Sequence, residues 1–166
     1  FGFTCALLTN GTAKCWGSDL KGQLGDGGTV NTSAPVVVNG LTGAVDVTAG
    51  DRHTCALLAD GTAKCWGDNT RNQIGDGTVT DRAAPTTVAG LTGAVDISAG
   101  ASHTCVVLTD GTAKCWGDNG FGQSGATAIA AGFGFTCALL TNGTAKCWGS
   151  NRNGQLGDAS TVNRQT

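Results

Sequence analysis

The residues of this chain that could do chemistry are mainly its cysteines, of which there are eight. They fall into four pairs with the two members ten positions apart: Cys5 and Cys15, Cys55 and Cys65, Cys105 and Cys115, and Cys137 and Cys147. A disulfide within each pair is the first interpretation. Two alternatives stay open, namely reduced cysteines buried in a core and a zinc site that would have to combine two pairs, because no Cys-x-x-Cys motif is present.

Few other residues could act as bases or metal ligands. His53 and His103 are the only histidines, and no serine and aspartate recur with them in the manner of a hydrolase. Because other copies of the surrounding motif carry Phe3 and Phe135 at this position, we expect the histidines to form structural hydrogen bonds.

Acidic residues gather in one loop, which contains Asp68, Asp76 and Asp81. Their spacing does not match a twelve-residue calcium loop, so we expect the carboxylates to cap turns. The sequence therefore predicts no catalytic residue, no bound metal and no cofactor.

The cysteines belong to a unit that occurs four times, with copies that begin at Thr4, Thr54, Thr104 and Thr136. Each copy has two short runs of β-formers around an Asn-Gly or Asp-Gly pair, which is a strong hairpin signal. A two-residue loop would place Cys5 opposite Trp16. A three-residue loop with Gly11 left-handed would place Cys5 opposite Cys15. We favour the second, because opposed Cβ atoms about 4.5–5.5 Å apart can adjust to a disulfide.

A full period adds two further strands to this hairpin. The run 84–88 predicts an edge strand opened by Pro85, and Val95, Ile97 and Ala99 alternate with polar residues as in a half-buried strand. The third period is shorter and lacks the counterpart of residues 76–93. About four strands per period of 40–50 residues, each period with a Trp-Gly pair that we expect to pack between units, predict the blades of a β-propeller.

The motifs also resemble a known family. The segment from Ser98 to Gly125 combines Ala-Gly, His-Thr-Cys, Asp-Gly, Trp-Gly-Asp-Asn and Gly-Gln-x-Gly. This pattern is similar to the regulator of chromosome condensation (RCC1-type) repeat, particularly its cysteine-bearing bacterial form. The resemblance covers essentially all of residues 1–166 and implies a seven-bladed propeller that binds proteins through loops on one face. One eukaryotic member of the family is a nucleotide exchange factor that binds chromatin, and a bacterial relative inhibits β-lactamases.

The chain holds about three and a half such repeats, so it would form an incomplete ring. Two interpretations follow: a piece of a longer propeller, or an arc that a second copy completes. Open blade edges invite association in either case.

Composition narrows the classes of partner and compartment. The net charge of −2 disfavours nucleic acid, and no apolar run is long enough for a membrane span. The absence of methionine suggests a processed product or part of a longer chain. If the disulfides form, an oxidising compartment follows, which is extracellular, at the cell surface or periplasmic.

The residues that differ between copies indicate where a partner would bind. Those that follow each Trp-Gly pair should recur around one rim and mix apolar with cationic groups: Leu20, Lys21, Arg71, Phe121 and Arg152. Such a mixture suits protein recognition. We therefore expect a non-enzymatic module that binds proteins through rim loops. The alternative is a structural building block that self-associates through its open edges.

Overall fold

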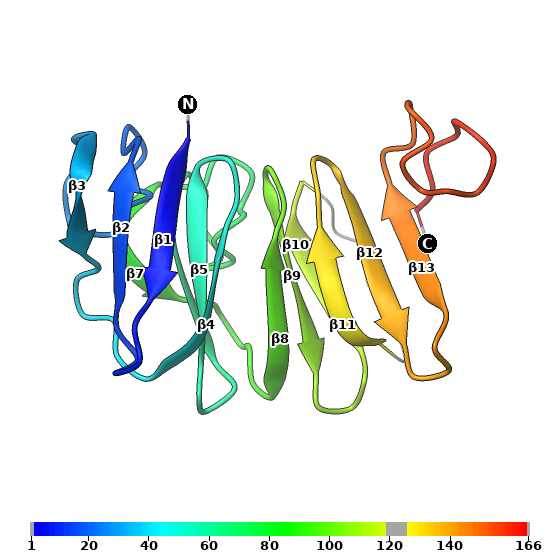
Figure 1. Ribbon diagram of the computed structural model, residues 1–166, viewed down its shortest axis with the longest axis horizontal. Coiled ribbons are helices and arrows are strands. Elements are labelled where there is room, and N and C mark those ends of the chain that lie inside the picture. The colour runs from blue at the N-terminus through cyan, green and yellow to red at the C-terminus, as the bar shows by residue number, and fades with distance from the viewer. Residues whose placement is uncertain (1, 119–125, 166) are drawn as a thin grey trace.

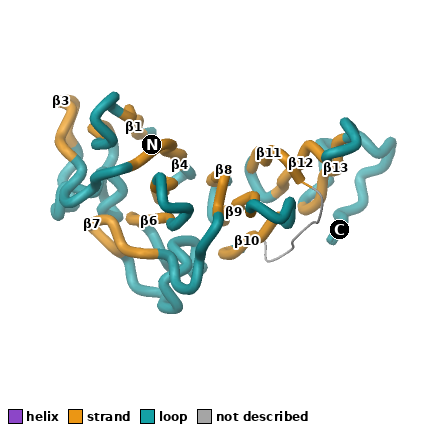
Figure 2. The backbone as a smooth tube through the Cα atoms, turned by 90° about the horizontal axis from the view of Figure 1, so that it is seen from below, coloured by secondary structure: helices purple, strands orange, loops and turns teal. Residues whose placement is uncertain are grey.

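The computed structural model describes residues 2–118 and 126–165 of the chain, and within them it consists of strands and loops without a helix. Figure 1 shows the strands as a row of sheets, and Figure 2 shows that the row is curved and open. The expected all-β propeller architecture is confirmed.

Four antiparallel sheets follow one another along the chain. The first contains β1 (Phe3–Leu7), β2 (Ala13–Gly17) and β3 (Thr32–Val37), and the second β4 (Ala44–Ala49), β5 (His53–Leu58), β6 (Ala63–Gly67) and β7 (Arg82–Thr87). The third contains β8 (Ala94–Ala99), β9 (His103–Leu108) and β10 (Ala113–Gly117), and the fourth β11 (Ala126–Ala131), β12 (Phe135–Leu140) and β13 (Ala145–Gly149). Each sheet is a propeller blade, and the second shows its complete four-stranded form.

The central hairpin of each blade has the register favoured from the sequence. Cys5 lies directly opposite Cys15, and Gly11 has a φ of 75°, which a glycine adopts without steric cost. All four predicted disulfides are present, each joining Cα atoms 4.1 Å apart. The turn therefore decides the pairing, because its length sets which cysteine faces which.

The outer strand begins earlier than expected. Pro85 lies inside β7 rather than at its start. The backbone N–H of Val88 donates to the carbonyl of Ala63 at 3.0 Å, so alternate residues of β7 face β6 and the nitrogen of Pro85 faces away from the ladder. A proline costs no ladder hydrogen bond there.

The inner strand also departs from the expected alternation. The pairing of β8 with β9 shifts in register between Ala94 and Asp96. This bulge turns Val95 outward, where it is 53% exposed, and buries Ala94 instead. The prediction that Val95 shares the buried face with Ile97 and Ala99 was wrong.

The cores lie between neighbouring blades. One cluster combines Leu24, Val38 and Leu41 of the first blade with Ala56 and Trp66 of the second. Trp66 is completely buried there, as expected for a side chain that packs between blades. Each blade is thus stabilised chiefly by its neighbours.

Among the described residues, three of the four blades have only three strands. No strand there pairs with the outer edge of β10, in agreement with the short third period, and Trp116 is only partly buried. In the first blade Thr4 is exposed, whereas its counterparts Thr54, Thr104 and Thr136 are completely buried.

Candidate functional site

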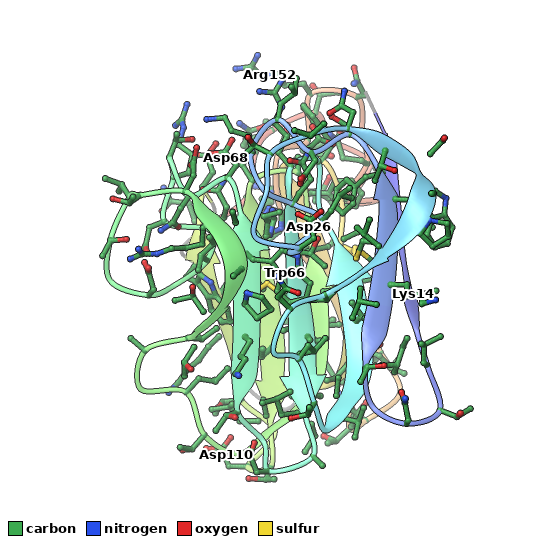
Figure 3. The ribbon with its side chains drawn as sticks, turned by 90° about the vertical axis from the view of Figure 1, so that its left-hand side faces the viewer. Lys14, Asp26, Trp66, Asp68, Asp110 and Arg152 are labelled. Atoms are coloured by element: carbon green, nitrogen blue, oxygen red, sulfur yellow. A yellow bond between two sulfur atoms is a disulfide. The ribbon has the colours of Figure 1, made fainter. Side chains whose placement is uncertain are left out.

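The loops that follow β2, β6 and β13 lie at one end of the blades. In Figure 3, Asp68 and Arg152 lie toward this end, and Asp110, in the turn between β9 and β10, lies at the opposite end. We call the loops 18–31, 68–81 and 150–163 the rim loops.

Each rim loop is held by a buried residue at its start. Asn69 accepts a hydrogen bond from the backbone N–H of Ile74 at 3.0 Å, and Asn151 accepts one from Leu156 at 2.9 Å. Asp19 takes the same place in the first loop and accepts from Leu24 at 2.8 Å. All three side chains are completely buried, so the base of each loop is fixed.

A glutamine holds the tip of each loop. The side-chain oxygens of Gln23, Gln73 and Gln155 accept from the backbone N–H two residues earlier, at 2.8–2.9 Å. The tips are therefore preorganised.

The glutamine backbone ties two of these loops to the following blade. The carbonyl of Gln23 accepts from the hydroxyl of Thr54 at 2.7 Å and from the indole of Trp66 at 2.9 Å. The carbonyl of Gln73 accepts from Thr104 at 2.8 Å and Trp116 at 3.0 Å. Sequence reasoning did not assign this role to the asparagines and glutamines, although glutamine recurs after every Trp-Gly pair and asparagine after all but the first, where Asp19 stands.

The side chains at the tips differ in how accessible they are to a partner. Leu20 is 65% exposed, and Arg71 and Arg152 are exposed as well. Arg71 contacts Asp118 at 3.3 Å. Lys21 is less accessible, because its ammonium forms an ion pair with Asp81 of the next rim loop at 2.8 Å. Phe121 lies outside the described residues.

Arg152 also lines a groove at the rim of the last blade. The groove has a volume of about 700 Å³, and Phe133, Asn153 and Arg164 line it as well. Phe133 is 76% exposed. An aromatic ring beside two arginines is a combination enriched in protein interfaces.

The two histidines serve the contacts between blades. His53 and His103 are buried, and their Nε2 atoms lie 2.9 Å from the hydroxyls of Thr104 and Thr136 in the next blade. Burial lowers the pKa of both imidazoles, that of His53 to about 4. The expected structural hydrogen bonds are therefore present.

Two of the three acidic loop residues cap turns, as expected, whereas Asp81 accepts from the backbone N–H of Asn69 at 2.9 Å, twelve positions away. Asp68 accepts from the backbone N–H of Thr70, and Asp76 from that of Thr78, both at 2.9 Å. Burial alone would raise the pKa of Asp76, but hydrogen bonds from Thr78, Arg82 and Asn69 outweigh it and lower the pKa to about 2.

Sequence profiles decide the family. Two profiles described as the Regulator of chromosome condensation (RCC1) repeat match the chain, one over residues 44–73, 94–123 and 126–155 and the other over residues 10–57 and 60–107. The chain belongs to the RCC1 repeat family.

Solved RCC1-type propellers share its fold. Human WBSCR16 is 20% identical with a TM-score of 0.87 over 98% of this chain and 49% of its own. Prp20 from Saccharomyces cerevisiae, solved bound to Kap60, is 20% identical with a TM-score of 0.79 over 94% of this chain and 44% of its own. The same protein has described binding properties toward Gsp1p and histones.

A plant receptor also matches. The ectodomain of the Physcomitrella patens receptor kinase CR4 is 25% identical with a TM-score of 0.63 over 92% of this chain and 41% of its own. This RCC1 repeat chain thus spans about half the length of the solved chains that it resembles. No match to a curated protein sequence was found.

Two negative findings concern residues 2–118 and 126–165. This part of the RCC1 repeat chain contains no helix long and apolar enough to span a membrane. It also contains no group of three or more histidine, cysteine or acidic side chains placed to hold a metal ion.

Proposed function

We propose that this RCC1 repeat chain is a protein-binding module that acts outside the reducing cytoplasm and recognises its partner through the tips of the rim loops. The observation that carries the proposal is the contrast within each loop between a repeated frame and a varied tip. Asn69 and Gln73 fix the second loop, while the neighbouring Arg71 is exposed. A preorganised surface binds at a smaller entropic cost.

The chemistry of the tips supports a protein partner. Leu20 offers an exposed apolar group, and Arg71 and Arg152 can form charged hydrogen bonds with carboxylates. The groove beside Arg152 adds Phe133 and Arg164. The described partners of Prp20, which are Kap60, Gsp1p and histones, agree with a binding role for the fold.

The disulfides support an extracellular, cell-surface or periplasmic location. Four of them in a chain of 166 residues would be reduced in most cytosols. The similar CR4 structure is a receptor ectodomain. We further propose that the module is not an enzyme, since His53 and His103 are occupied in contacts between blades.

A pair of triple variants, each with three added glutamates, tests the rim. One carries Leu20→Glu, Arg71→Glu and Arg152→Glu. The control carries three glutamates at exposed positions of the hairpin turns: Thr9→Glu, Ala59→Glu and Thr141→Glu. Proteins cross-linked to the wild type in the extracellular fraction of its source should be lost with the rim variant and retained with the control. Equal capture by both variants would overturn the proposal.

A second candidate function is self-association through the open face of the first blade. Thr4 is exposed and Trp16 is only partly buried there, whereas their counterparts Thr54 and Trp66 are completely buried between blades. A second copy could cover this face. Sedimentation equilibrium of the wild type and of Thr4→Arg tests it: a dimer that Thr4→Arg dissociates supports the idea, and a wild-type monomer at high concentration rejects it.

A further inference from the structure

The rim loops of the second and fourth blades each balance the charge of one carboxylate internally. Asp76 pairs with Arg82, with 2.7 Å between oxygen and nitrogen, and Asp158 pairs with Arg164 at 2.8 Å. Each loop therefore contains one carboxylate and one guanidinium at this point. The two positions in the pair are six residues apart in both loops.

An asparagine supplies a second donor to each of these carboxylates. The Nδ2 atom of Asn69 donates to Asp76 at 3.0 Å, and that of Asn151 donates to Asp158 at 2.9 Å. The same Nδ2 atoms donate to the backbone carbonyls of Thr78 and Ser160, both at 3.0 Å. Each asparagine nitrogen thus lies among oxygen acceptors.

The first rim loop has the same backbone, but a hydrogen-bond acceptor replaces the donor of the other loops. Asp19 stands at the asparagine position, and its Oδ1 accepts from Leu24 as the asparagine oxygens do from Ile74 and Leu156. Its Oδ2 therefore takes the place of the donor nitrogen. Asp26 stands where Asp76 and Asp158 stand and accepts from the backbone N–H of Gly28 at 2.8 Å. The Oδ2 atom of Asp19, which accepts hydrogen bonds, thus takes a position that in the other loops is surrounded by hydrogen-bond acceptors.

The structure leaves this oxygen without a partner. Asp19 is completely buried, and among the described residues its Oδ2 atom forms no hydrogen bond of ordinary length, although the backbone N–H of Val30 also favours the charged carboxylate. Burial raises the pKa of Asp19 and the charge of Asp26 adds to this effect, and together they outweigh the backbone hydrogen bonds from Leu24 and Val30, which lower it. A buried carboxylate in this state requires a compensating proton or cation.

The charge balance favours a divalent cation. Thr32 occupies the position of Arg82 and Arg164, so the first loop has lost a positive charge as well as gained a negative one. Asp19 and Asp26 together carry two negative charges where the other loops are neutral. The nearby Lys21 does not compensate, because it pairs with Asp81.

We propose that the first rim loop binds a divalent cation of the calcium type between Asp19 and Asp26. Calcium accepts six to eight oxygen ligands in flexible geometry, including carboxylates, backbone carbonyls and water. By its position, the carbonyl of Gly28 supplies a third oxygen, as those of Thr78 and Ser160 do for the asparagines. Gly27 is exposed, so water completes the shell.

The site has few protein ligands, so the affinity should be modest. We expect a dissociation constant on the order of 10⁻⁴–10⁻³ M, as in extracellular calcium modules. This binding does not depend on the proposed protein partner, and it would stiffen the loop that carries Leu20.

Terbium luminescence and thermal unfolding of the whole chain test the site. Gly25, next to Asp26, packs against the indole of Trp66, so a terbium ion in the loop should emit when tryptophan is excited. Calcium chloride should displace terbium and raise the melting temperature by several degrees. Sodium chloride at equal ionic strength is the control for screening.

Two substitutions should weaken binding of both ions without unfolding the chain, because each installs the residue of another blade. Asp19→Asn restores the donor, and Thr32→Arg restores the cation. Each should weaken terbium and calcium binding about tenfold or more, and Asp19→Asn should melt above the calcium-free wild type. The matched control Asp60→Asn, in an exposed hairpin turn, should bind as the wild type does.

Three results would overturn the proposal. One is a wild type whose luminescence and melting temperature do not respond to terbium or calcium at millimolar concentration. Another is calcium binding that survives both Asp19→Asn and Thr32→Arg. The third is stabilisation by acid alone, which would mean that a proton shared between Asp19 and Asp26 occupies the site.

Discussion

The imidazole of His53 and the hydroxyl of Thr104 join the second blade to the third, with 2.9 Å between Nε2 and Oγ1. Thr104 donates its own hydrogen to the carbonyl of Gln73 at 2.8 Å, so its oxygen accepts from the ring and the proton of His53 resides on Nε2. The other nitrogen, Nδ1, is buried and has no partner among the described residues. His53 thus acts as a neutral donor between blades.

This arrangement predicts a loss of stability in mild acid. Burial, with a contribution from His103, lowers the pKa of His53 to about 4, whereas an unfolded histidine has a pKa of about 6.5. Between these values the unfolded chain binds a proton that the folded chain does not. The stabilisation is therefore complete above pH 6.5 and is lost as pH falls toward 4, by roughly 3 kcal/mol. The free energy of unfolding, measured with urea at several pH values in this range, should decrease as the pH falls. In the His53→Phe variant this decrease should be smaller. An unchanged pH dependence in that variant would contradict the assignment of the effect to His53.

The loss of stability on replacement of His53 should depend on the shape of the new side chain. Phe135 occupies the corresponding position in the fourth blade, and its ring packs on Gly132 as that of His53 packs on Gly50. His53→Phe should cost about 1 kcal/mol, the hydrogen bond to Thr104. His53→Ala also leaves a cavity and should cost about 2–4 kcal/mol more. The free energies of unfolding of both variants can be measured by chemical denaturation. Equal losses in His53→Phe and His53→Ala would show that packing of the ring does not stabilise the contact between blades.

Gly25 should tolerate alanine much less well than Gly77, although both have positive φ. A Cβ atom on Gly25 would meet the indole nitrogen of Trp66 at 2.6 Å, whereas one on Gly77 would meet nothing within 4 Å. Gly77→Ala should cost about 1–2 kcal/mol from the backbone alone. Gly25→Ala should add about 1–3 kcal/mol from overpacking. Thermal unfolding of the two variants makes the comparison, and similar melting temperatures would refute it.

The disulfides should stabilise each hairpin separately. Replacement of both Cys55 and Cys65 by alanine removes one bridge over ten residues and should lower the free energy of unfolding by about 2–3 kcal/mol. The intact mass of the unreduced chain should be lower than that of the thiol form by two hydrogens for each of the four bridges. A mass with full hydrogen content would remove the argument for an oxidising compartment.

Sequence alone determined the features that depend on local geometry. The turn at Gly11 decides that Cys5 faces Cys15, because a three-residue loop fixes the register of the strands on either side. The repeated Trp-Gly pairs and the alternation around Ile97 likewise indicated blades. These features need only residues close together in the chain.

Only the tertiary structure decided how the blades meet. The carbonyl of Gln23 accepts from Thr54 and Trp66, which are 31 and 43 positions away, and nothing local requires those contacts. The bulge that exposes Val95 and the ion pair that engages Lys21 also depend on neighbouring strands and loops. The burial of the unpartnered Asp19 oxygen likewise depends on how the first rim loop packs. The physical reason is that burial and the supply of hydrogen-bond donors depend on the stacking of blades, which no single repeat encodes.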